Sequence, residues 1–366
     1  MKKAPPSPLL MRLDAHIKAE RNRTKAGCLR AERAGYVGRL GFFEEAHAEL
    51  EHLHQEFSRQ PEPDVIAWIQ VAEGWLAYYR EEYSESRDHL MRAYAISTAT
   101  GLISIRVLSA AWLAYLAYFV DDFEEMNIYL RVAFREVRDD DHLSQTRLCL
   151  LFAIAYLFGD RFDLAKHWFT KSRGHATISN DDAALSALNF NMTGRRVTHA
   201  LIASSRGEDI DDSFELAKVG MNSSIAFDHL LGISLVGYWS QPIQAMVYSV
   251  SKSYANAVAV YEAHLHTSLP KGMLSRKPML LADLSWCYLN VGELEKARTT
   301  AESAESLIGA DLDLEDQVIL YGRLKQLHTV LKGTGCATRF AALQDESNRQ
   351  LGERRQYILS LLPDMS

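Results

Sequence analysis

The feature that most constrains this chain is a pattern that recurs about every 40 residues. Six short stretches match one another: GFFEEA, EEYSES, DDFEEM, DRFDLA, KSYANA and GELEKA. The third position of each stretch, here called the anchor, is occupied by Phe43, Tyr83, Phe123, Phe162, Tyr254 and Leu294. The anchors are separated by 40, 40, 39, 92 and 40 residues, and the long interval leaves room for a degenerate unit around Ile210. A fixed period of this size predicts a solenoid of stacked helical units.

Residues around each anchor repeat the same character. Small residues stand nine positions before it, at Ala34, Gly74, Ala114, Ala153, Ala245 and Ser285. Mostly small residues stand three positions after it, at Ala46, Ser86, Met126, Ala165, Ala257 and Ala297. This spacing places small residues on the facing sides of two consecutive helices, which can then cross closely. No stretch alternates apolar and polar residues as a half-buried strand would, so we expect an all-α protein.

This set of positions resembles the tetratricopeptide repeat, over about Arg23 to Leu307. The resemblance implies a right-handed superhelical α-solenoid of about seven helical hairpins, closed by a C-terminal capping helix region. The period here is nearer 40 than the usual value of about 34 residues. In this it is similar to the longer-helix variants of MalT-like bacterial regulators and of peptide-sensing regulators of the Rap type.

Three segments are expected. Residues 1–22 form a basic N-terminal segment with a leading helix, residues 23–310 form the repeat array, and residues 311–366 form capping helices. Within the array, the unit at about 181–228 matches the pattern poorly and should pack irregularly. Residues 1–40 carry ten Lys and Arg against three Asp and Glu, a balance of +7 in a chain of net charge −7. That basic end is either a solvated capping helix or a contact for an acidic partner.

Composition indicates a cytoplasmic protein with no membrane span. The longest apolar runs, Ser109–Val120 and Leu148–Gly159, have twelve residues each, whereas a spanning helix needs about 20. Prolines interrupt the basic N-terminus, and no apolar signal region follows it. The four cysteines are scattered without a CxxC pair, so a disulfide framework is not predicted.

The resemblance also implies where a ligand would bind. In tetratricopeptide arrays the first helix of each hairpin lines the concave side, and carrying this over by position gives an aromatic groove. The predicted binding residues are Trp68, Trp75, Tyr78, Tyr79, Tyr115, Tyr118, Phe158, Trp239 and Trp286. Aromatic surface of this kind favours an apolar or amphipathic peptide or protein. The alternative is that rings such as Tyr115 only fill the interior of a narrow superhelix.

Enzyme and metal signatures are missing from the sequence. It contains no GxSxG, HExxH, P-loop or GxGxxG motif in a suitable context. His47, Glu51 and His54 share one helix face and could hold zinc, but His and Glu are common on the outer face of an amphipathic helix. We therefore predict no catalytic residue, no metal and no cofactor.

The sequence thus predicts a non-catalytic protein- or peptide-binding scaffold or adaptor. The alternative is a ligand-responsive regulatory or sensor component of a bacterial transcription or defence system. No DNA-binding helix-turn-helix is evident and nucleic-acid binding is not predicted, so such a component would act through a partner. Self-association is compatible with either function, because the apolar ends of solenoids often pair.

Overall fold

A computed structural model describes residues 3–210, 213–231, 237–265, 269, 273–309, 312–331 and 333–362. Over these residues the chain is helical with no β-strand, which confirms the predicted all-α class. The described helices are α1 (Pro8–Ala19), α2 (Arg23–Arg39), α3 (Phe43–Phe57), α4 (Pro63–Tyr79), α5 (Tyr83–Thr100), α6 (Ile103–Phe119), α7 (Phe123–Glu136), α8 (His142–Phe158), α9 (Phe162–Ser179), α10 (Asp182–Arg206), α11 (Ser213–Leu231), α12 (Gly237–Val250), α13 (Tyr254–Leu265), α14 (Lys277–Asn290), α15 (Leu294–Ser306), α16 (Leu314–Val330) and α17 (Thr334–Leu361).

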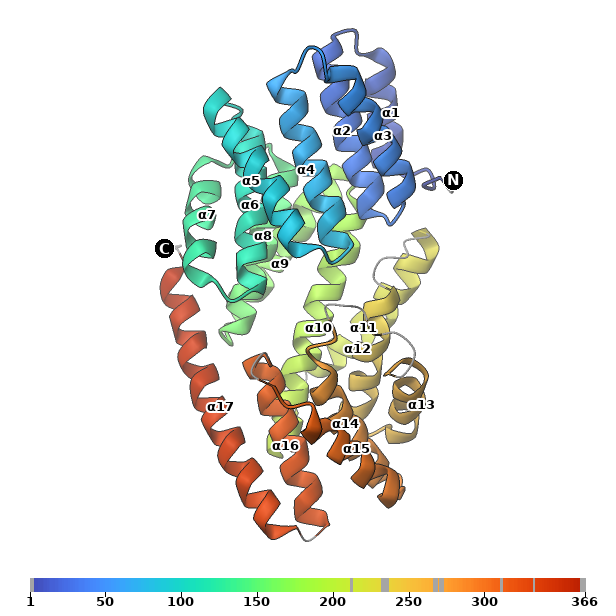
Figure 1. The fold of residues 1–366 in the computed structure, drawn as a ribbon, viewed down its shortest axis with the longest axis vertical. Coiled ribbons are helices and arrows are strands. Elements are labelled where there is room, and N and C mark those ends of the chain that lie inside the picture. Colours follow the sequence, from blue (N-terminus) through green and yellow to red (C-terminus); the bar gives the residue numbers. More distant parts are fainter. Residues whose placement is uncertain are drawn as a thin grey trace. The chain divides into compact units, whose positions relative to one another are not determined.

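The chain divides into two compact units. Unit 1 comprises Met1–Leu188, Asp228–Leu235 and Ile358–Ser366, and unit 2 comprises Asn189–Phe227 and Val236–Tyr357. In unit 1 the hairpins α2/α3, α4/α5, α6/α7 and α8/α9 follow one another along the chain (Figure 1). Every anchor is the first residue of the second helix in its hairpin, in both units. The predicted repeat is therefore a real structural period.

The turn inside each hairpin has one repeated backbone geometry. The residue two positions before the anchor has a positive φ in all six units: Gly41, Glu81, Asp121, Asp160, Lys252 and Gly292. The next residue donates its backbone N–H to the carbonyl five positions earlier, at 2.8 to 3.2 Å between nitrogen and oxygen. This is a Schellman motif, which ends the first helix and satisfies its last carbonyls.

The small positions are where the two helices of a hairpin meet. Those nine residues before the anchor are buried in every unit. At Gly74, an added Cβ would lie 2.8 Å from Leu90 Cγ, so the helices α4 and α5 approach too closely for a larger residue. Ser86 of α5 donates its hydroxyl to the Gly74 carbonyl at 2.8 Å, and Ser285 of α14 donates to the Ala297 carbonyl at 2.7 Å. Close crossing thus follows from the repeat itself.

Unit 2 contains the degenerate part of the repeat. Its first pair consists of the C-terminal part of α10 and α11, which pack closely at Gly220, where a Cβ would lie 2.7 Å from Thr193 Oγ1. The hairpins α12/α13 and α14/α15 follow, and α16 packs on α14. The last helix, α17, packs against α16 at Phe340, whose ring stacks on that of Tyr321 with the ring centroids 6.3 Å apart.

A buried polar network holds the centre of unit 2. The Asp283 carboxylate of α14 accepts hydrogen bonds from Ser249 Oγ (2.9 Å), Tyr261 OH (2.8 Å) and Arg323 Nε (2.7 Å). Arg323 also donates to Ser204 Oγ at 3.1 Å. Because the buried carboxylate has several donors, its charge is compensated, and the network has the properties of a structural tie between α10, α12, α13, α14 and α16.

Two further observations bear on the expected setting of the protein. Among the helices in the described ranges, none combines the length and apolar character needed to cross a bilayer. All four cysteines, Cys28, Cys149, Cys287 and Cys336, are free thiols. Burial raises the pKa of both Cys28 and Cys149 to about 12, so these two behave as packed apolar side chains.

Candidate functional site

Four aromatic side chains meet on the first helices of unit 1. We call Trp75 and Tyr78 of α4 and Trp112 and Tyr115 of α6 the inner aromatic cluster. Each helix contributes two rings three residues apart, which places both on one face. The ring centroids lie 5.9 Å apart for Trp75 and Trp112 and 5.3 Å apart for Tyr78 and Trp112. The cluster therefore joins two successive repeats by ring contacts, tilted for Trp75 and Trp112 and edge-to-face for Tyr78 and Trp112.

The tyrosine hydroxyls of the cluster are linked to each other. Tyr78 OH donates to Tyr115 OH at 3.3 Å. Burial is the main reason that the pKa of Tyr78 lies well above its usual range, so the phenol remains a neutral donor. Trp75 is 1% exposed, and its indole N–H is buried without a hydrogen-bond acceptor in the described part of the chain. Unpaired buried donors are uncommon and need an explanation.

A buried arginine covers this cluster from the next repeat. Arg147 of α8 is 6% exposed, and its guanidinium carbon lies 3.5 Å from the centroid of the Trp112 ring and 4.4 Å from that of the Tyr115 ring. No carboxylate or other acceptor among the described residues forms an ion pair or hydrogen bond with it. A desolvated cation on an aromatic face gains about 2 kcal/mol, less than the several kcal/mol that burying a charge costs. Arg147 is thus a charge that stacking only partly compensates.

A second buried arginine is paired with a carboxylate. Arg39 at the end of α2 forms a bidentate ion pair with Asp181, at 2.9 and 3.1 Å between nitrogen and oxygen. Burial alone would lower the pKa of Arg39, but Asp181 and the Tyr79 hydroxyl outweigh burial and raise it. Asp181 also accepts from the Ala184 backbone N–H at 2.9 Å and so begins α10. Both oxygens of this carboxylate are engaged.

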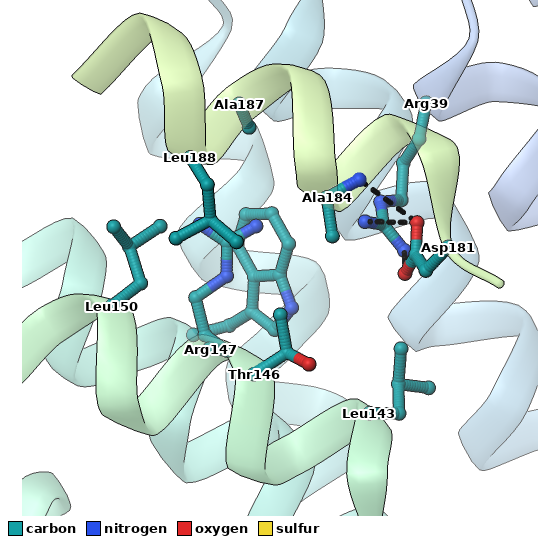
Figure 2. A pocket seen from close by; sticks show the side chains of 10 residues that line it. Arg39, Leu143, Thr146, Arg147, Leu150, Asp181, Ala184, Ala187 and Leu188 are labelled. Atoms are coloured by element: carbon teal, nitrogen blue, oxygen red, sulfur yellow. Dashed lines mark hydrogen bonds and ion pairs between the residues drawn. The ribbon is translucent and has the colours of Figure 1, made fainter. Parts of the chain in front are cut away.

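Between these two arginines lies a small recess. Its lining combines Arg39, Trp112, Thr146, Arg147 and Asp181 with the aliphatic residues Leu143, Leu150, Ala184, Ala187 and Leu188. Figure 2 shows Arg147 rising from α8 toward the side of α10 that carries Ala187 and Leu188, with the Arg39–Asp181 pair at the other end. The recess is partly open and has a volume of about 10 Å³, which is room for one water-sized group.

An unusual carboxyl group lies in the same unit. Glu32 of α2 is half-buried, and burial raises its pKa to about 7, with further upward contributions from the carboxylates of Asp181 and Asp141. Arg12 opposes the shift. Perturbed groups of this kind cluster at functional sites, although structural charge networks perturb pKa values as well.

The structure brings seven of the nine predicted binding residues together. Trp68 contacts Trp75 at 6.4 Å, Tyr79 contacts Tyr78 at 5.1 Å, and Tyr118 contacts Phe158 at 6.4 Å between ring centroids. Tyr115 and Tyr118 are connected through Phe119, which is 51% exposed. Trp75, Tyr115, Tyr118 and Phe158 are buried, and the other three are half-buried. Their role in binding stays a prediction.

The remaining two predicted residues belong to unit 2. Trp286 is half-buried, and the guanidinium carbon of Arg323 lies 5.5 Å from its ring centroid. Trp239 is in α12, and its side chain lies outside the described residues.

Sequence reasoning overlooked Arg147, although a signal for it exists. Arg147 stands fifteen residues before its anchor, where the three preceding repeats have Cys28, Trp68 and Leu108. A charged residue at a position that is otherwise apolar is the signal. The ring partner Trp112 was also overlooked, because it lies one helical turn before the predicted groove position.

His47, Glu51 and His54, which share one helix face, do not converge as a triplet in the structure. His54 instead contacts Glu73 of α4, at 2.7 Å between Nε2 and Oε1. In the parts of the chain that are described, no three His, Cys, Asp or Glu side chains converge in a way that would hold a metal ion.

Comparison with known proteins supports the fold. No protein-family model matches the chain, and no curated protein matches it by sequence. Among solved structures, it is similar to a Rap protein in complex with competence and sporulation factor, with a TM-score of 0.52 and 12% identity. The match covers 94% of this chain and 98% of the Rap chain. At this identity the likeness concerns the fold, which is a helical-repeat fold of the tetratricopeptide type.

Proposed function

We propose that this protein is a non-catalytic scaffold that binds a peptide or protein segment on the inner helices α4, α6 and α8 of unit 1. The observation that supports this most is the inner aromatic cluster with Arg147 stacked on it. Aromatic side chains and arginine dominate binding hot spots, because they combine large contact area with polar donors. In unit 1 such side chains come from three successive repeats.

Burial of these rings sets the kind of ligand that we propose. Trp75 and Trp112 are buried, so a ligand would reach the half-buried Tyr79 and the exposed Phe119 first. Tyr78, Tyr79 and Phe119 form an apolar surface with hydroxyl groups, which suits an amphipathic segment. The likeness to a Rap protein that was solved with a bound factor agrees with a peptide ligand.

A pool of synthetic peptides would test the proposal. The full chain is immobilised and incubated with peptides of mixed sequence, and retained peptides are quantified by mass spectrometry. The double variant Tyr79→Ala/Phe119→Ala should retain at least about tenfold less than wild type, since both rings lie at the accessible edge. Ile128→Ala is the matched control, because Ile128 is 61% exposed on the second helix α7.

Two results would count against the proposal. The first is a wild-type protein that retains no peptide from the pool above a blank support. The second is equal retention by the double variant and the Ile128→Ala control. Circular dichroism and thermal melting of each variant show whether a loss reflects binding or folding.

A regulatory role is the second candidate. It is supported by the likeness to a Rap protein whose bound factor is named for competence and sporulation. In this case peptide binding would change the conformation of the chain and so control a partner in the cytoplasm. Small-angle scattering with and without a retained peptide distinguishes the two roles. An unchanged profile favours a scaffold, and a changed profile favours a regulator.

A further inference from the structure

We propose that Arg147 binds a carboxylate group of the ligand, either the C-terminal carboxylate of a peptide or an Asp or Glu side chain. This inference rests on the proposed function and names the chemistry that unit 1 recognises. The starting point is that Arg147 is a buried cation that lines the recess. No acceptor among the described residues forms a hydrogen bond or ion pair with it.

The first step of the argument concerns charge. Arg147 is 6% exposed, and the described residues supply no anion for it. The closest candidate at the recess, Asp181, is engaged on both oxygens by Arg39 and also caps α10 through the Ala184 N–H. Since Arg39 and Asp181 neutralise each other, the recess carries the uncompensated charge of Arg147. Buried charges are ordinarily paired, so an external anion would complete the site.

The second step concerns orientation. The guanidinium carbon lies 3.5 Å from the centroid of the Trp112 ring and 4.4 Å from that of the Tyr115 ring. The two rings are inclined at 75° to each other, so the planar group can stack face-on to only one of them, and the shorter distance is to Trp112. Stacking uses only the face of the planar group and leaves the N–H groups on its edge for in-plane acceptors. A planar fork of donors matches a carboxylate bidentately, and the surrounding low dielectric strengthens such a bond. The position of the arginine is therefore preorganised for a planar anion.

The third step concerns size. The recess has a volume of about 10 Å³, enough for one water-sized group such as one carboxylate oxygen, and it is partly open, so the second oxygen can lie at its mouth. Its remaining walls are the aliphatic side chains of Leu150, Ala184, Ala187 and Leu188, which offer no competing acceptor. A small terminal group thus fits the recess better than a bulky tetrahedral anion would.

Three pools of synthetic peptides separate the sources of the carboxylate. The first has free C-terminal carboxylates and no Asp or Glu, the second has C-terminal carboxamides and no Asp or Glu, and the third has C-terminal carboxamides with Asp or Glu at random positions. Wild-type protein should retain the first or the third pool at least about tenfold better than the second. Preference for the first assigns a C-terminal carboxylate, and preference for the third assigns an acidic side chain.

Variants of Arg147 then test the residue itself. Arg147→Met keeps an unbranched apolar stem but removes the charge, and it should retain all three pools equally. Arg147→Lys keeps the charge without the planar fork, and it should retain a reduced preference. Arg131→Met is the matched control, because Arg131 is an exposed cation on α7, and it should behave as wild type. Circular dichroism verifies folding, and Arg147→Lys decides the test if Arg147→Met does not fold.

The outcomes distinguish this inference from the function on which it rests. If wild type retains the carboxamide pool without Asp or Glu as well as the other two, or if a folded Arg147→Met keeps the acid preference, the carboxylate site is wrong while peptide binding stands. If wild type retains no pool, peptide binding itself is wrong, and the carboxylate site falls with it.

Discussion

At the scale of single residues, the charges buried in unit 1 have two different fates. Arg39 is paired with Asp181 on both of its terminal nitrogens, whereas Arg147 is stacked on rings without an anion. A paired buried arginine is costly to disturb, because removing the partner leaves an isolated charge in the interior. The two arginines should therefore respond differently to substitution.

The substitution Asp181→Asn should destabilise unit 1 by about 3–5 kcal/mol, since it leaves Arg39 buried without a counter-charge. The asparagine side chain can still accept the hydrogen bond from the Ala184 N–H at the start of α10. The loss of unfolding free energy therefore measures the ion pair rather than the helix cap. Denaturant unfolding monitored by tryptophan fluorescence measures the effect. Asp163→Asn is the control, because this carboxylate is 69% exposed in its ion pair with Arg161. A loss below about 1 kcal/mol would mean that the Arg39–Asp181 pair is not a structural tie.

Glu32 predicts a specific dependence of stability on pH. Burial raises its pKa to about 7 in the folded chain, against an ordinary value of 4.5 for a glutamate. Between these values the folded state binds more protons than the unfolded state, so this group makes the unfolding free energy fall as pH rises. Glu32→Gln removes that penalty. Its stability relative to wild type should increase from about pH 5 to about pH 8, as measured by denaturant unfolding across that range. A constant difference would show that the pKa of Glu32 is not raised.

The repeat pattern places the aromatic residues on their helices but does not place the charge of Arg147. The aromatic positions follow from their spacing to the anchors, so seven of them could be placed on the first helices of unit 1. Arg147 could not be assigned to Trp112, because the two residues are 35 positions apart and meet only through the packing of α6 against α8. Contacts between neighbouring repeats depend on helix crossing geometry, which a repeat pattern does not specify.

At the scale of helices, the hairpin turn is the most regular element. Six turns have a residue with positive φ two positions before the anchor, but only Gly41 and Gly292 are glycines there. The other four residues adopt the left-handed region at a cost of roughly 1 kcal/mol each, because Cβ crowds the following carbonyl. The hydrogen bonds of the Schellman motif and the packing of the hairpin offset this cost.

Two alanine substitutions should have opposite effects on stability. Gly292→Ala should lower the unfolding free energy by about 1 kcal/mol, since φ is +87° and a Cβ has open space around it, so that only backbone strain is tested. Gly174→Ala within α9 also meets no atom within 4 Å and should raise it by roughly 0.5–1 kcal/mol through helix propensity. Thermal and denaturant unfolding of both variants provide the comparison. The same sign for both would contradict the assigned turn geometry.

The region around α10 could be predicted only in part. The poor match of the unit at about 181–228 was evident from the sequence, and its small residues Ala217 and Gly220 lie in α11, where Gly220 meets Thr193 of α10. The length of α10 was not foreseen: it has 25 residues, whereas α2, α4, α6 and α8 have 17 each. Asp181 caps the start of α10, and Gly207, which has a φ of +80°, follows its end. No residue between these two ends the helix. Its single glycine, Gly194, lies inside the helix.

At the scale of the whole chain, the sequence repeat does not follow the division of the chain into two compact units. The repeat continues from Phe43 to Leu294, yet the chain forms two compact units that divide within α10, between Leu188 and Asn189. A solenoid repeat reports only contacts between neighbours, so it carries no information about where such a division falls. The polar network around Asp283 in unit 2 and the aromatic cluster in unit 1 are separate centres of packing.

Hydrogen–deuterium exchange of the full chain, with and without a retained peptide, tests the central claim that the inner helices of unit 1 bind the ligand. The account predicts slower exchange in Pro63–Tyr79, Ile103–Phe119 and His142–Phe158, with little change in the second helices Tyr83–Thr100 and Phe123–Glu136. Slower exchange confined to those second helices, or to α12–α16 of unit 2, would contradict it.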